Sequence, residues 1–154
     1  MEITHVKSSQ KKDVVIELVS EEDYLFITED DYHFDWELEK KNVVYKLKIP
    51  DDDEILGLMS LKDIPSESRV EIILLASSVI NTGKNKIYDG IAGNLIAFAC
   101  RESVRLYADN AFVSLHPKTE LKSYYMAQYG FQNAGIQIYL ESTPMFNLMN
   151  KYQI

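Results

Sequence analysis

Three small residues, Gly90, Ala92 and Gly93, stand directly before an apolar stretch in the segment NKIYDGIAGNLIAFAC. The first N–H groups of a helix have no partners within the helix, and its dipole adds about half a positive charge at that end. Small residues leave this end open to an anion, and glycine adopts the backbone angles that turn successive N–H groups inward. The segment therefore favours a phosphate site, and a pyrophosphate would suit it best.

Two basic residues upstream, Lys84 and Lys86, would add positive charge near the same anion. The small residues have a second interpretation, because they also allow a helix to pack closely on a sheet. The dinucleotide-binding spacing G-x-G-x-x-G and the P-loop spacing G-x-x-x-x-G-K-[ST] are both absent from the sequence. A phosphate loop in this chain would therefore belong to neither of those classes.

The other candidate reactive residues favour structural roles. His116 follows a predicted strand, but no metal-ligand spacing accompanies it, so we interpret it as a loop residue. Cys100 is the only cysteine and lies in the most apolar part of the chain without a basic partner, which argues against a thiol nucleophile. Acidic runs at 21–23, 29–31 and 51–54 are interpreted as solvated turns, with a cation site as the alternative.

The elements that must position these residues follow from apolar periodicity. Alternation predicts an antiparallel meander of strands at 34–38, 45–49, 55–61 and 70–76, with acidic and proline-containing turns. Residues 91–107 are apolar around much of a helical circumference and predict a buried helix. Beyond it we expect a strand at 111–115, a helix at 118–129 ended by Gly130, one strand at 131–141 with a bulge at Gly135, and a short amphipathic helix at PMFNLMNKY.

This order of elements predicts an α/β (α+β) fold with a mixed, mostly antiparallel central sheet flanked by helices. The N-terminal region is the least clear, and residues 14–19 favour a strand over a short helix. A chain of 154 residues can bury a sufficient core without disulfides, and it contains no repeat or flexible linker. We therefore predict a single domain spanning residues 1–154.

Charge and composition exclude several classes of partner. The net charge of -8 repels phosphate backbones, so we expect no nucleic acid partner and favour an amine-bearing one. No stretch approaches the ~18 apolar residues of a membrane span, and the N-terminus lacks the pattern of a secretory leader. With a single buried cysteine, the sequence predicts a cytoplasmic protein without a membrane partner.

An ordered set of segments resembles the GNAT superfamily of acyl-CoA-dependent N-acyltransferases. The set is EIILLASS, YDGIAGNLIAFA, AFVSL and the helix ending in QYGF, within about residues 43 to 141. The family's phosphate loop reads [QR]-x-x-G-x-[GA]; here Gly90 and Ala92 match it, while Ile87 stands at the Gln/Arg position. The resemblance implies a GNAT-like fold with acetyl-CoA as co-substrate.

The resemblance also implies which residues hold this co-substrate. Backbone N–H groups from Asp89 to Asn94 would hold the CoA pyrophosphate, which assigns Asp89, Gly90, Ile91, Ala92, Gly93 and Asn94. At the end of the preceding strand, Leu75, Ala76 and Ser77 would bond the pantetheine arm as if it were an added strand. In such folds this strand and AFVSL splay apart to admit the thioester.

Catalytic roles follow from the same resemblance. Similar enzymes often place a tyrosine acid near the end of this helix, and here SYYMAQYGF offers Tyr124 and Tyr125, of which Tyr125 is favoured. Tyr125 stands five residues before Gly130, where four is usual, and could instead pack against the sheet. Glu71 would be the base, directly or through a water, or else a surface residue, and backbone N–H groups near Ala76 could stabilise the oxyanion.

The resulting hypothesis is an enzyme that moves an acetyl group from acetyl-CoA to a primary amine by direct transfer in a ternary complex. The acceptor would be a small molecule or a peptide, and the strand at 131–141 could pair two copies into a homodimer. The alternative is a non-catalytic GNAT-like acyl-CoA-binding or protein-interaction module. It is favoured by Ile87, by the displaced tyrosine, and by Lys118 and Thr119 where the family often has an asparagine.

Overall fold

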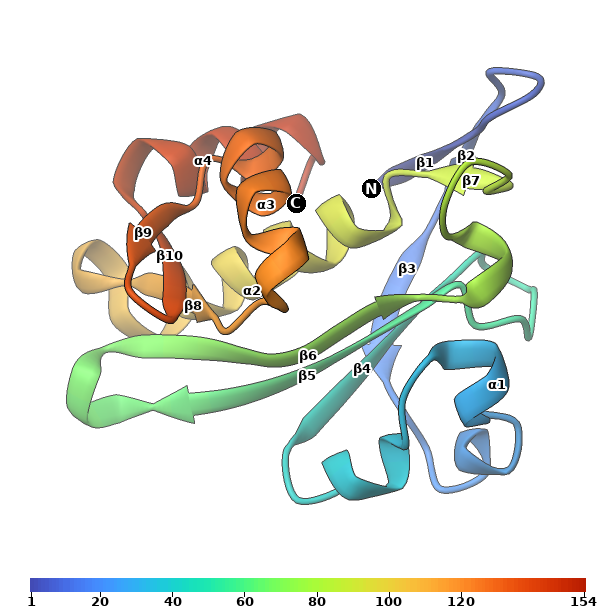
Figure 1. Cartoon of the computed structure of the whole chain (residues 1–154), viewed down its shortest axis with the longest axis horizontal. Helices are drawn as coiled ribbons and strands as arrows, with labels where there is room; N and C mark the ends of the chain where they lie inside the picture. The colour runs from blue at the N-terminus through green and yellow to red at the C-terminus, as the bar shows by residue number, and fades with distance from the viewer. The chain divides into compact units, whose positions relative to one another are not determined.

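The computed structural model describes residues 1–154, apart from the side chain of Thr119 (Figure 1). Its strands are β1 Glu2–His5, β2 Lys11–Asp13, β3 Val15–Leu18, β4 Val43–Lys48, β5 Gly57–Ile64, β6 Arg69–Ser77, β7 Tyr88–Asp89, β8 Phe112–Leu115, β9 Gln132–Ala134 and β10 Gln137–Glu141. Its α-helices are α1 Glu29–Tyr32, α2 Ile91–Tyr107, α3 Lys122–Tyr129 and α4 Ser142–Lys151. Six 3₁₀ turns join them: η1 Asp23–Leu25, η2 Trp36–Glu39, η3 Pro65–Glu67, η4 Val79–Asn81, η5 Ala108–Asn110 and η6 Thr119–Leu121.

The described strands form two sheets. The smaller has the order β2-β1-β7, and the larger has the order β3-β4-β5-β6-β8-β10-β9. In the larger sheet β6 and β8 run parallel, whereas β3 with β4, β8 with β10, and β10 with β9 run antiparallel. Figure 1 shows β5 and β6 as a long hairpin. The predicted mixed, mostly antiparallel sheet flanked by helices is confirmed.

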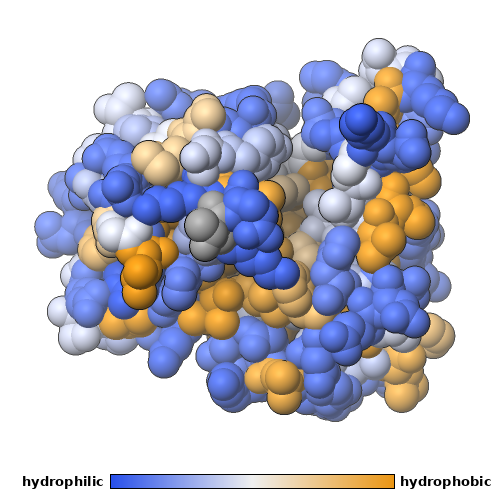
Figure 2. All heavy atoms as spheres, in the orientation of Figure 1, coloured by the Kyte–Doolittle hydropathy of each residue, from blue (hydrophilic) through white to orange (hydrophobic). Residues whose placement is uncertain are grey.

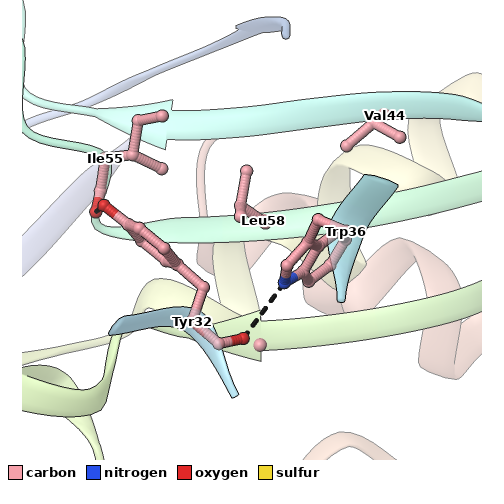
Figure 3. Close-up of a cluster of buried hydrophobic side chains, with 6 residues drawn as sticks. Tyr32, Trp36, Val44, Ile55 and Leu58 are labelled. Carbon is pink, nitrogen blue, oxygen red and sulfur yellow. Dashed lines mark hydrogen bonds between the residues drawn. The ribbon is translucent and has the colours of Figure 1, made fainter. Parts of the chain in front are cut away.

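By its internal contacts the chain divides into two compact units, of which the first comprises Met1–Ser60 and Leu74–Leu95. Figure 3 shows part of its core, a cluster built from Tyr32, Trp36, Val44, Ile55 and Leu58 together with Ala76. Trp36 is 1% exposed and its indole N–H donates to the Tyr32 carbonyl at 3.0 Å. The Tyr32 hydroxyl in turn donates to the Ile55 carbonyl at 2.9 Å. These bonds satisfy the polar atoms of both aromatic side chains inside an apolar core.

The second unit comprises Leu61–Ile73 and Ile96–Ile154. Its core contains two rows of apolar side chains that run across β6, β8 and β10. One row is Val70, Val113 and Leu140, and the other is Ile72, Leu115 and Ile138; every member is buried. Each row alternates along the strands with residues that face the other side of the sheet, as the pleat requires. The prediction of a single domain stays a prediction.

Most elements lie where the sequence predicts them, including strand β3 and helices α2 and α4, but the predicted strand at 34–38 is wrong. Alternate apolar residues there form the 3₁₀ turn η2, in which the Asp35 side chain accepts a hydrogen bond from the Glu37 N–H. The turn buries Trp36 and Glu39, three residues apart, and leaves Leu38 67% exposed. A 3₁₀ turn has three residues per turn, so this spacing places both buried residues on one side.

Two further differences concern chain reversals. The stretch predicted as one strand at 131–141 is the hairpin of β9 and β10, which turns at Gly135 with φ +79°. The N-terminal pair β1 and β2 and the short strand β7 were not predicted; β1 pairs with β7, more than eighty residues later in the chain. The acidic run at 29–31 begins α1, capped by the Thr28 side chain, instead of forming a turn.

Hydrophilic residues cover most of the face drawn in Figure 2, and apolar residues appear as separate patches. None of the described helices has the length and apolar character needed to cross a bilayer. The part of the chain that the structure describes contains no group of three His, Cys, Asp or Glu residues that could hold a metal ion.

Candidate functional site

The turn that begins α2 carries backbone features that suit an anion. Gly90 adopts φ +97°, a left-handed backbone conformation that residues with a β-carbon rarely adopt. The Asn94 N–H donates to the Gly90 carbonyl at 3.1 Å. The N–H groups of Ile91, Ala92 and Gly93 precede this bond, so the helix itself supplies no acceptor for them. Three successive donors at the positive end of a long helix suit a phosphate group.

Asn94 fixes this turn through its side chain. It is fully buried, and its Nδ2 donates to the carbonyls of Gly90 and Glu2, each at 2.8 Å. Glu2 belongs to β1, whose partner β7 lies directly before Gly90. The Asn94 N–H already donates to the Gly90 carbonyl, so the prediction that this N–H holds the pyrophosphate is corrected. Asn94 instead orients the turn that carries the other predicted residues.

Helix α2 begins in close contact with β5. A β-carbon built on Gly57 would stand 2.5 Å from Ile91 Cγ2 and 3.3 Å from the Ala76 carbonyl oxygen. The first turn of α2 and the end of β6 therefore both approach the same glycine. This contact brings together the predicted phosphate loop and the predicted pantetheine strand within the first unit.

The end of β6 extends past its parallel neighbour. The pairing of β6 with β8 runs from Arg69 opposite Phe112 to Ile72 opposite Leu115, where β8 ends. Strand β6 continues to Ser77, and the next N–H, that of Ser78, donates to the Leu56 carbonyl at 2.8 Å. A strand edge that outruns its neighbour presents backbone N–H and C=O groups to an added strand. Leu75, Ala76 and Ser77 lie on this stretch.

Lys86, one of the two lysines before the loop, forms an ion pair. Lys86 Nζ lies 2.8 Å from Asp89 Oδ1 in an exposed ion pair, so its charge is shared with a carboxylate beside the nest. The expectation that Lys86 adds positive charge at the anion must be corrected accordingly. Ile87 is 39% exposed; its carbonyl accepts from the Val6 N–H at 2.9 Å, a backbone contact with the segment after β1.

Glu71 lies on β6 in the second unit and faces away from the buried Val70 and Ile72, as alternation predicts. Its side chain is 16% exposed, so it is a largely covered carboxylate. Arg69 Nη1 lies 3.5 Å from Glu71 Oε2. Across the sheet, the residue paired with Glu71 on β8 is Ser114.

Tyr125 lies on α3 within a group of aromatic rings. Its ring centroid is 5.9 Å from those of Tyr124 and Tyr129 and 6.2 Å from that of Phe131. Burial, with a smaller contribution from Tyr124, raises the pKa of Tyr125 above 10.0. The hydroxyl therefore stays protonated near neutral pH, the state that a general acid requires. Glu71 and Tyr125 have separate neighbours: the first contacts an arginine, the second aromatic rings.

The remaining candidates fit structural roles. Cys100 is fully buried on α2, and burial raises the pKa of its thiol to about 12, so the thiolate that a nucleophile requires does not form near neutral pH. His116 is exposed in the segment after β8. The side chain of Thr119 lies outside the described residues.

Two polar side chains that matter to the geometry were not predicted from sequence. Arg69 was missed, although the alternation in RVEI places it on the same face as Glu71. For Asn94 only the backbone N–H was assigned, and no local signal indicates that its side chain bonds to the first residues of the chain.

Structure comparison identifies acetyltransferases. An acetyltransferase from Bacillus subtilis, in complex with CoA, shares 15% identity with a TM-score of 0.59, covering 84% of this chain and 99% of that one. A variant of the spermidine N-acetyltransferase from Vibrio cholerae shares 14% identity with a TM-score of 0.61, covering 90% and 97%. The ribosomal-protein-S18-alanine N-acetyltransferase from Escherichia coli shares 10% identity with a TM-score of 0.58, covering 83% and 93%. No family model and no curated protein matches the sequence. The likenesses establish the fold.

Proposed function

We propose that this chain, which has the fold of the GNAT acetyltransferases, transfers an acetyl group from acetyl-CoA to a primary amine. The observation that carries the proposal is the approach of Ile91 and Ala76 to Gly57. Both the start of α2, whose first N–H groups have no acceptor within the helix, and the end of β6 lie near this glycine in one compact unit, which supports a shared site. CoA has a pyrophosphate joined to an extended arm that contains amides. The pyrophosphate suits the N–H groups of α2, and the arm suits the edge of β6.

In this proposal the N–H groups of Asp89, Gly90, Ile91, Ala92 and Gly93 hold the pyrophosphate, and Asn94 fixes the turn. The backbone of Leu75, Ala76 and Ser77 pairs with the pantetheine arm. Both features fit the ligand chemically, since a nest of N–H groups binds an anion and a strand edge binds amides. Acetyl-CoA, when bound, supplies an activated acetyl thioester.

The chain's own residues then handle two protons. The ammonium group of the acceptor first gives one proton to solvent, which frees the lone pair that attacks the thioester. As the C–N bond forms, a second proton leaves the acceptor nitrogen for the Glu71 carboxylate, directly or through a water. As the C–S bond breaks, the Tyr125 hydroxyl gives a proton to the departing sulfur. Exchange with solvent returns both side chains to their starting states, so the net change moves one proton from nitrogen to sulfur and releases one proton to solvent. The N–H of Ala76 stabilises the carbonyl oxygen as it gains negative charge.

The acceptor is a cationic primary amine, either a small molecule or a peptide. Two proteins of similar structure are named for amine acceptors: spermidine for one and the alanine of a ribosomal protein for the other. In this chain the acidic residues 29–31 begin α1, which contacts η4, the turn that directly follows β6. Together with the net charge of -8, this arrangement favours a positively charged substrate.

We further propose a cytoplasmic protein that forms a homodimer through β9, the last strand of the larger sheet. A non-catalytic acyl-CoA-binding or interaction module is the second candidate. The observation that favours it is Met126, which stands four residues before Gly130 and cannot donate a proton.

A thiol-release assay with acetyl-CoA and a panel of amines tests the proposal. We expect release that depends on an amine, a loss of at least tenfold in kcat for Glu71→Gln and for Tyr125→Phe, and unchanged affinity for CoA. Tyr124→Phe is the matched control for the neighbouring hydroxyl. CoA binding without turnover of any amine would support the non-catalytic candidate, and unchanged rates in both variants would refute the assigned roles.

A further inference from the structure

The guanidinium of Arg69 is held from several sides in the second unit. Its side chain is only 13% exposed. Nε donates to the Glu67 carboxylate, and Nη1 donates to Ser114 Oγ at 2.7 Å. The same Nη1 lies 3.5 Å from Glu71 Oε2. An arginine so fixed has little freedom to reorient.

These contacts form a diagonal bridge between two parallel strands. Arg69 pairs with Phe112, and Glu71 pairs with Ser114. Arg69 therefore reaches across from β6 to the residue on β8 that stands opposite Glu71. Ser114 is 3% exposed, so the anchor of this bridge is shielded from solvent.

The chemistry of arginine suits a positioning role. A guanidinium presents several N–H donors in a rigid planar fork, so it can bond one partner firmly and orient a second. Ser114 and Glu67 supply the firm contacts. The longer contact to Glu71 leaves that carboxylate with lone pairs for another proton donor, while the opposite charge restricts its rotamers.

We propose that Arg69 is a positioning residue for Glu71: anchored by Ser114 and Glu67, it holds the carboxylate in the orientation that accepts the proton of the acceptor amine. This inference rests on the proposed function, in which Glu71 is the base. It assigns Arg69 no contact with acetyl-CoA or with the amine.

A double-mutant cycle on the full chain tests it, with Arg69→Met, Glu71→Gln and the double variant. For Arg69→Met we expect kcat to fall roughly tenfold while KM for acetyl-CoA stays within about twofold, because only transition-state geometry is lost. Arg69→Lys should recover part of that loss. If Arg69 acts through Glu71, the double variant is no slower than Glu71→Gln, since the two effects do not add.

Two further variants keep the test interpretable if Arg69→Met fails to fold. Ser114→Ala removes the anchor and keeps the charge, so kcat should fall in the wild-type background and stay unchanged in the Glu71→Gln background. Arg105→Met is the matched control, because Arg105 also pairs with a carboxylate, Glu102 at 2.9 Å, but is 65% exposed. It should leave kcat unchanged.

The outcomes separate this inference from the proposed function. If Arg69→Met and Ser114→Ala both keep the wild-type kcat while Glu71→Gln lowers it, Arg69 does not position Glu71. Glu71 then remains the proposed base. Fully additive losses in the cycle also overturn it, because they indicate a general structural role. Wild-type kcat in Glu71→Gln refutes the proposed base, and the positioning role falls with it.

Discussion

Ile91 Cγ2 lies 2.5 Å from the point where a β-carbon on Gly57 would stand. A side chain larger than hydrogen fits there only if the Ile91 side chain, α2 or β5 moves. The absence of a β-carbon on β5 therefore allows the first turn of α2 to sit against the sheet beside the Ala76 carbonyl. This contact, together with the bonds of Asn94 to Gly90 and Glu2, positions the turn of the proposed phosphate nest.

Gly57→Ala tests that dependence. We expect overpacking to lower the free energy of unfolding by about 1–3 kcal/mol and to weaken CoA binding as the first turn of α2 shifts. Urea unfolding and titration calorimetry measure the two effects. In the double variant Gly57→Ala/Ile91→Ala the loss of stability should be smaller than the sum of the single losses, and a simple sum would contradict the contact.

Gly90→Ala tests the backbone of the nest. Gly90 has φ +97°, so alanine there costs about 1–2 kcal/mol of stability or forces the turn to open. We expect a loss of at least tenfold in CoA affinity by calorimetry, because the N–H groups no longer converge. Gly135→Ala, at φ +79° in the turn of the second unit, is the matched control. It should lose similar stability while keeping full CoA affinity, and equal losses of affinity would refute the nest.

The pair of Asp23 and Lys46 should make stability depend on pH. Burial would raise the pKa of Asp23, but hydrogen bonds from Lys46 and Ser20 outweigh it and lower the pKa below 3.8. Because the folded pKa is the lower one, this stabilisation is present above about pH 4 and is lost as pH falls through the folded pKa. The Lys46 Nζ and Asp23 Oδ2 atoms are 2.7 Å apart, and both side chains are mostly buried.

Asp23→Asn should therefore lower the free energy of unfolding by roughly 1–3 kcal/mol at pH 7. The difference from wild type should shrink as pH falls below about 4, and urea unfolding across the acid range measures it. Glu37→Gln, which removes a carboxylate that pairs with Lys40 and is 57% exposed, is the control and should have little effect. A constant difference at every pH would contradict the assignment.

Cys100 should be inert in the folded protein. Its thiol is fully buried and its pKa is raised to about 12, so thiolate is scarce up to about pH 9. We expect an aromatic disulfide reagent to label the thiol only after denaturation. Cys100→Ala should keep the affinity for CoA and any acetyl transfer. Rapid labelling of the native protein would contradict the packing of α2.

Long periodic elements were predictable from sequence, as α2 shows, because seventeen residues carry one continuous apolar pattern. Short elements were not: the alternation of Phe34, Trp36 and Leu38 is equally compatible with a strand and with the turn η2. Strand β1 escaped prediction because Ile3 is its one fully buried residue and its partner β7 is distant in sequence.

Parts of the candidate site were likewise predictable from the sequence, and other parts were not. The positive φ of Gly90 fits its residue type, so the left-handed turn before α2 could be predicted locally. The contacts of the Asn94 and Arg69 side chains join segments far apart in sequence, Asn94 with Glu2 and Arg69 with Ser114. Such contacts exist only once the sheet is assembled, and for that reason no local pattern indicates them.

In the proposed function, the N–H groups at the start of α2 bind the pyrophosphate of CoA. Amide NMR spectra of the ¹⁵N-labelled protein, recorded while CoA and then pantetheine are added, test it residue by residue. We predict that CoA shifts the signals of Ile91, Ala92 and Gly93 together with those of Leu75, Ala76 and Ser77, and that pantetheine shifts only the second group. If the signals of Ile91, Ala92 and Gly93 stay unchanged at millimolar CoA, these N–H groups do not bind the pyrophosphate.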